Sequence, residues 1–157
     1  METLHTIRKW LDKIVGTICI FLFALMVVVG SYQIITRFIF NNPSTISEEL
    51  LTYSFAWMAM FATAYVFGKR DHMRMTFVVD KLAPAQRKVL EIVLEVLVIA
   101  FAAIVLIYGG FNIMGLTMTQ KTASLGVMMG QVYAVVPISG ILIAIYGILN
   151  VVDLCKG

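Results

Sequence analysis

The sequence predicts an all-α integral membrane protein with four transmembrane helices and an amphipathic interfacial segment between the second and third helices. Its 157 residues are 61% hydrophobic and 13% charged, whereas soluble domains are about 45–50% apolar and about 25% charged. A spanning helix needs about 20 apolar residues. Four stretches of sufficient length lack Asp, Glu, Lys and Arg: Ile14–Thr36, Leu50–Gly68, Val96–Gln120 and Thr122–Asn150. We therefore expect a single membrane domain over 1–157, and a soluble enzyme is excluded.

The basic residues predict the orientation of the chain. Ten of the 12 Lys and Arg lie in the N-terminus, the loop between the second and third helices, and the C-terminus, while Arg37 and Lys121 are alone in the other two loops. Cytoplasmic loops carry an excess of Lys and Arg. Both termini are therefore expected in the cytoplasm. This distribution accounts for the net charge of +3, so no nucleic-acid partner is expected.

The first helix is expected over about 10–36, with Trp10 and Tyr32 at the two interfaces. Its apolar stretch exceeds the 7–15 residues typical of a signal peptide, so we expect it to be retained. The two cysteines, Cys19 and Cys155, have neither disulfide nor metal spacing.

The second helix is expected over about 48–67, after a loop rich in helix-start signals. Pro43 suits a first helical position, and Thr45-x-x-Glu48 matches a capping box. Glu48 and Glu49 then lie in the first turn, where the helix dipole favours carboxylates. Arg37 flanks the same loop, so an ion pair with either Glu and simple capping are both open.

Residues 72–84 alternate apolar and charged side chains and are expected to lie in the plane of the membrane interface. The third helix, over about 85–116, is long enough to be tilted. Arg87, Glu91 and Glu95 follow at four-residue intervals on one face. This pattern fits an interfacial ion-pair ladder or a partner contact, and it leaves open Glu95 as a proton carrier.

The fourth helix is expected over about 130–152, with a kink near Pro137. The chain has no phosphate-binding loop, nucleophile elbow or metal cluster, so it is not expected to be an enzyme. His5 and His72 lie outside the apolar runs, which leaves a membrane haem without axial ligands. No cofactor and no metal are expected.

Three stretches carry a resemblance to a known family. They are Arg-Phe-Ile-Phe-Asn-Asn-Pro-x-x-x-Ser-Glu-Glu-Leu at 37–50, continuing through Trp57 and Phe61, then 71–80 and 124–137. Together they resemble the DctQ-like small membrane subunit (Q subunit) of tripartite ATP-independent periplasmic (TRAP) transporters.

The resemblance implies a non-catalytic scaffold subunit of a sodium-coupled symporter in the bacterial inner membrane. Such a subunit pairs with a separate large TRAP membrane subunit, and a periplasmic substrate-binding protein delivers an organic acid of the C4-dicarboxylate or sialic acid class. The candidate structural or subunit-interface residues, including two in the family's cytoplasmic motif and two from the third helix, are Arg37, Glu48, Glu49, Trp57, His72, Asp80, Glu91 and Glu95.

Two other readings compete with this one. A self-contained small proton-coupled efflux transporter would use Glu95 as its membrane carboxylate. A redox membrane anchor would dock a soluble oxidoreductase and would need a haem or quinone site.

Overall fold

The computed structural model describes residues 2–69 and 84–156 as an all-α fold whose four helices are long and apolar enough to cross a membrane. This confirms the predicted fold class. The first two spans are α1 (Glu2–Phe38) and α2 (Thr45–Gly68). The third is α4 (Pro84–Phe101), the π-helix η1 (Ala102–Tyr108) and α5 (Gly109–Thr117), and the fourth is α6 (Met129–Tyr133) and α7 (Val135–Lys156).

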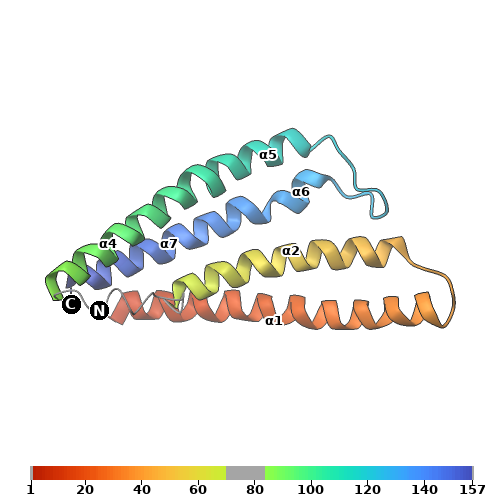
Figure 1. Cartoon of the computed structure of the whole chain (residues 1–157), viewed down its shortest axis with the longest axis horizontal. Helices are drawn as coiled ribbons and strands as arrows, with labels where there is room; N and C mark the ends of the chain where they lie inside the picture. The colour runs from red at the N-terminus through yellow and green to blue at the C-terminus, as the bar shows by residue number, and fades with distance from the viewer. Residues whose placement is uncertain (1, 70–83, 157) are drawn as a thin grey trace.

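The helices form two hairpins that lie side by side, α1 with α2 and the third span with α6 and α7 (Figure 1). Both termini lie at one end of the bundle, here called the terminal end. The loops 39–44 and 118–128 lie at the opposite end, here called the loop end. The predicted interfacial segment 72–84 lies outside the described residues, apart from Pro84, which begins α4.

The last span is the centre of the fold. Half of its most apolar window is buried (50%), against 17% for α2 and 6% for each of the other two spans. It packs against α2 on one side and against α4 and η1 on the other, while α1 packs mainly on α2. The third span is therefore an outer helix with one neighbour, the last span.

Two helix starts differ from the predictions. α1 begins at Glu2, because the polar first turns continue the helix beyond the apolar run. The N-cap of α2 is Ser44, whose hydroxyl oxygen accepts a hydrogen bond from the backbone N–H of Ser47 at 3.4 Å. The Thr45-x-x-Glu48 capping box was therefore wrong by one residue, since the extended backbone that a cap requires occurs at Ser44.

A break near Pro137 divides the last span. α6 ends at Tyr133, four positions before the proline, and α7 begins at Val135, so Ala134 separates the two helices. Proline lacks an N–H and its ring collides with the carbonyl at that position. The indole N–H of Trp57, on the neighbouring helix α2, donates to the Val132 carbonyl oxygen at 3.0 Å. This bond gives a carbonyl oxygen next to the break a hydrogen-bond partner from another helix.

Glycines bring the third span close to the last one. A Cβ on Gly140 would lie 2.7 Å from Cβ of Leu106, and one on Gly147 would lie 2.5 Å from Cγ1 of Ile99. Without a hydrophobic effect between helices in lipid, such close backbone approach is a main source of helix association.

Replacing Gly110 by alanine should lower the midpoint of thermal unfolding in lipid nanodiscs. The new Cβ would lie 2.8 Å from Cδ and 2.9 Å from the backbone nitrogen of Pro137, and overpacking costs about 1–3 kcal/mol. Gly115 on the same helix is the matched control, because nothing lies within 4 Å of its Cβ position. Equal midpoints for Gly110→Ala and Gly115→Ala would contradict this packing.

Candidate functional site

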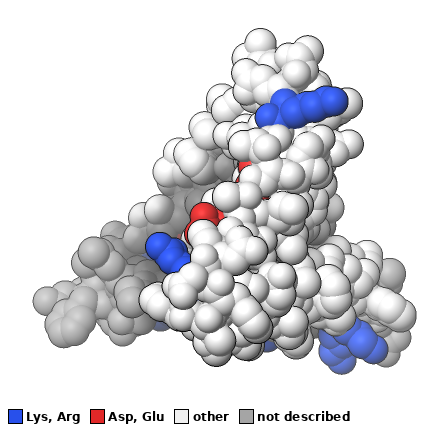
Figure 2. All heavy atoms as spheres, turned by 90° about the vertical axis from the view of Figure 1, so that its right-hand side faces the viewer, with Lys and Arg blue, Asp and Glu red and all other residues white. Residues whose placement is uncertain are grey.

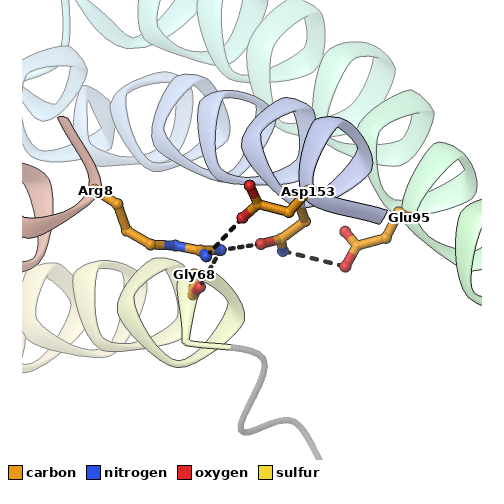
Figure 3. A network of polar contacts seen from close by, with 5 residues as sticks. Arg8, Gly68, Glu95 and Asp153 are labelled. Carbon is orange, nitrogen blue, oxygen red and sulfur yellow. Dashed lines mark hydrogen bonds and ion pairs between the residues drawn. The ribbon is translucent and has the colours of Figure 1, made fainter. Parts of the chain in front are cut away.

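A partly buried arginine connects three helices at the terminal end. From α1, Arg8 donates through Nη1 to Oδ2 of Asp153 on α7 at 3.1 Å, and through Nη2 to the carbonyl oxygen of Gly68 at the end of α2, also at 3.1 Å. Nη2 also donates to Oδ1 of Asn150 on α7. Figure 3 shows the side chain reaching from α1 toward both other helices.

Asn150 extends this network to the third span. Its side-chain amide donates to Oε1 of Glu95 on α4 at 3.1 Å, and the residue is fully buried. One turn away, the Tyr146 hydroxyl donates to Oδ1 of Asp12 on α1 at 2.8 Å. All four spans thus contribute to one group of polar contacts, here called the Arg8 network.

Local sequence places these groups on facing surfaces. Arg8 and Asp12 are one turn apart on α1, and Tyr146, Asn150 and Asp153 share a face of α7. Gly68 ends α2, and a helix end leaves carbonyl oxygens without an intrahelical partner. Gly68 also lets the Tyr146 ring pass, since a Cβ there would lie 2.6 Å from that ring.

The chemistry of the Arg8 network is that of a structural connection. Arg8 forms an ion pair with Asp153, and the two side chains are 23% and 37% exposed. Charge-assisted hydrogen bonds of this kind are about twice as strong as neutral ones. Among the described residues, no group of three or more His, Cys, Asp or Glu could hold a metal ion.

Reversing the charge of Arg8 should destabilise the fold. Arg8→Asp removes an ion pair and the donor to Gly68, and hydrogen bonds to charged groups contribute about 1.5–3 kcal/mol, so the unfolding midpoint in nanodiscs should fall. Adding Asp153→Arg should restore part of the loss, because the pair is then reversed. Lys9→Asp, on the exposed neighbouring residue, is the control. No recovery in the double variant would contradict the Arg8–Asp153 pair.

At the loop end, Glu49 holds the second loop in place. Its carboxylate accepts hydrogen bonds from the backbone N–H groups of Ala123 at 3.0 Å, Ser124 at 3.0 Å and Leu125 at 2.7 Å. The Tyr53 hydroxyl donates to the same carboxylate at 3.2 Å. One side chain of α2 thereby fixes the loop that precedes α6, which gives Glu49 a role different from N-terminal capping.

Replacing Glu49 by glutamine should free this loop. The side-chain amide would present N–H groups to backbone N–H groups, so at least one of the three bonds is lost. We expect amide hydrogen exchange at 123–125 to rise by about 10-fold or more. Glu48→Gln is the matched control, since Glu48 makes no described contact with this loop. Unchanged exchange in Glu49→Gln would contradict the contact.

The other predicted residues of the first loop have smaller roles. Arg37 lies 3.7 Å from Glu48, with both side chains about half exposed (59% and 48%), and exposed pairs contribute about 0–1 kcal/mol. Arg37 and Glu49 form no ion pair among the described contacts. Trp57 is half-buried, donates to Val132 and packs against Phe61 with ring centroids 6.0 Å apart.

The expected ladder on the third helix divides into two contacts. Arg87 pairs with Glu91 at 3.3 Å, one turn apart on α4. Glu95 instead accepts the hydrogen bond from Asn150. His72 and Asp80 lie outside the described residues.

Several residues of the Arg8 network were missed by the sequence analysis. Arg8 was counted only as one of the orienting cations, and Asp12, Asn150 and Asp153 were not singled out. A weak signal existed, because Asn150 ends a charge-free run and Asp153 follows it three residues later. Polar groups at the end of a span often face another helix.

Comparisons with known proteins identify the family. Residues 26–157 match the family profile described as "Tripartite ATP-independent periplasmic transporters, DctQ component". The chain is 24% identical over 141 residues to a TRAP transporter small permease protein of Haemophilus influenzae, covering 90% of this chain and 87% of that protein. It is 27% identical over 158 residues to the sialic acid TRAP transporter small permease protein SiaQ of Vibrio cholerae, covering 98% of this chain and 88% of that protein. With its four spans and a family match over most of its length, the chain belongs to the DctQ family of TRAP transporter small permease subunits.

Proposed function

We propose that this subunit is a non-catalytic scaffold of a sodium-coupled TRAP importer for an organic acid of the C4-dicarboxylate or sialic acid class. It pairs with a separate large membrane subunit, which carries the substrate and sodium sites. A periplasmic substrate-binding protein delivers the substrate. The subunit lies in the bacterial inner membrane with both termini in the cytoplasm.

The position of the polar groups carries this proposal. The described contacts of charged side chains gather at the two ends, in the Arg8 network and around Glu49. Between them, the long charge-free runs pack through apolar side chains and glycines. A transporter acting alone needs a substrate or ion site near the bilayer midplane. The described middle of this chain is an apolar packing layer instead.

The loop end supports the same assignment. Figure 2 shows that most of this face is uncharged, with a few basic side chains and an acidic side chain close to one of them near its centre. An open groove there is lined by Tyr32, Thr36, Phe40, Asn42, Pro43, Ser44, Thr45 and Ile46. None of these residues is cationic, whereas carboxylate recognition favours Arg or Lys. An organic acid is therefore better bound by a partner.

Two further observations support the finer parts of the proposal. The relative SiaQ is named for sialic acid transport, which favours an organic acid as the substrate. The concentration of ten of the 12 basic residues in the termini and the 69–88 region favours a cytoplasmic terminal end.

Affinity purification of the tagged chain from its native membrane should recover a stoichiometric, larger membrane protein, identified by mass spectrometry. The purified pair, with its binding protein, should take up the organic acid into liposomes along an inward sodium gradient. The small subunit alone is the control and should take up nothing. Solute transport by the chain alone, abolished by Glu95→Gln, would overturn the scaffold role.

A further inference from the structure

Lysines from two helices lie along one edge of the terminal end, where α1 and α2 run side by side (Figure 1). Lys9 and Lys13 are exposed and lie one turn apart on α1. Gly16 continues the same face three residues later, and a Cβ on it would lie 3.5 Å from Cε2 of Tyr65 on α2. Lys69, at the C-cap of α2, places its Nζ 4.5 Å from the centroid of that same ring. The Tyr65 ring thus adjoins both helices, and we call the surface around Lys9, Lys13 and Lys69 the lysine edge.

The described carboxylates of the terminal end bond to groups outside the lysine edge. Their partners are Tyr146 for Asp12, Arg8 for Asp153, Arg87 for Glu91 and Asn150 for Glu95. Lys9 and Lys13 form no ion pair with a residue that the structure describes. Their positive charge therefore needs an anion from outside the described part of the chain.

The lysine edge lies at the level of the lipid headgroups. Lys13 is the last charged residue before the charge-free run that begins at Ile14, and long lysine side chains extend toward the interface from such positions. Trp10 is 62% exposed on the same turns of α1, and exposed tryptophans of spans gather at the membrane–water interface. Ile20 follows Lys13 by seven residues on the same face and is 72% exposed. Cations at the level of the phosphates thus adjoin an apolar surface at the level of the acyl chains.

We propose that the lysine edge binds an anionic phospholipid, whose phosphate accepts hydrogen bonds from the ammonium groups of Lys9, Lys13 and Lys69. One acyl chain of this lipid lies along Ile20. Basic pockets between transmembrane helices are typical binding sites for anionic headgroups. A phospholipid carries the anion and the apolar chain in one molecule, at the same separation in depth as the two parts of the edge. This inference goes beyond the proposed scaffold role and does not depend on it.

Quenching of tryptophan fluorescence by brominated lipids measures this preference. The chain, with any partner that co-purifies from its native membrane, is placed in phosphatidylcholine nanodiscs that contain a small fraction of brominated phosphatidylglycerol or brominated phosphatidylcholine. The Trp10→Phe variant supplies the background from all other tryptophans. Phosphatidylglycerol should quench Trp10 more strongly at equal content, and the two titrations give a ratio of association constants. A ratio of one would overturn the proposed site, including the case in which a partner covers the edge.

Substitutions distinguish a site from the general charge of the membrane surface. Lys9→Gln and Lys13→Gln should each lower the ratio about fivefold, the effect of one basic residue near an anionic surface. The double variant with arginine at both positions keeps the charge and should retain the preference. Lys88→Gln is the matched control, because Lys88 is an exposed lysine of the same end on α4. An equal loss in Lys88→Gln, or no loss in either α1 variant, would overturn the site.

Discussion

The Arg8 guanidinium determines how α1, α2 and α7 meet at the terminal end. One side chain of α1 bonds to the end of α2 and to two side chains of α7. A guanidinium removed from water is costly unless its donors are paired. The position of α1 therefore depends on α7, although these two helices touch little elsewhere. Asn150 also connects α7 to the third span, because its side-chain amide donates to Glu95 on α4.

The loop end solves the corresponding problem with an anion. Glu49 lies near the start of α2 and accepts three backbone N–H groups of a loop that would otherwise need water. Between these two polar ends, the spans are held by shape, because Gly140 and Gly147 admit side chains of the third span. Polar pairing thus fixes the two ends of the bundle, and close packing fixes its middle.

The four spans and the all-α class could be predicted from the sequence, because the hydrocarbon requires long runs of apolar residues. The break near Pro137 was predictable for a similarly local reason, the missing N–H of proline. The partner of Arg8 was not, since Asp153 lies 145 residues away and composition says nothing about which distant helices meet. For the same reason the sequence could not separate Glu48 from Glu49. Consecutive helical residues point about 100° apart, and only the packed helices show which one faces the loop.

In a membrane, exposed apolar and exposed polar side chains carry different information. An exposed isoleucine on α7 has the same surroundings in lipid as in a protein contact, so its exposure says nothing about a partner. A carboxamide at the same depth does distinguish these surroundings, because lipid tails leave its donors and acceptor unpaired. The exposed hydroxyls of Thr17, Ser31, Thr52 and Thr63 meet this requirement within their own helices, because each donates to the backbone carbonyl four residues earlier. With one span half buried and the other three at most 17% buried, most of the surface that the described spans present to the membrane is left to be covered by lipid or by other proteins.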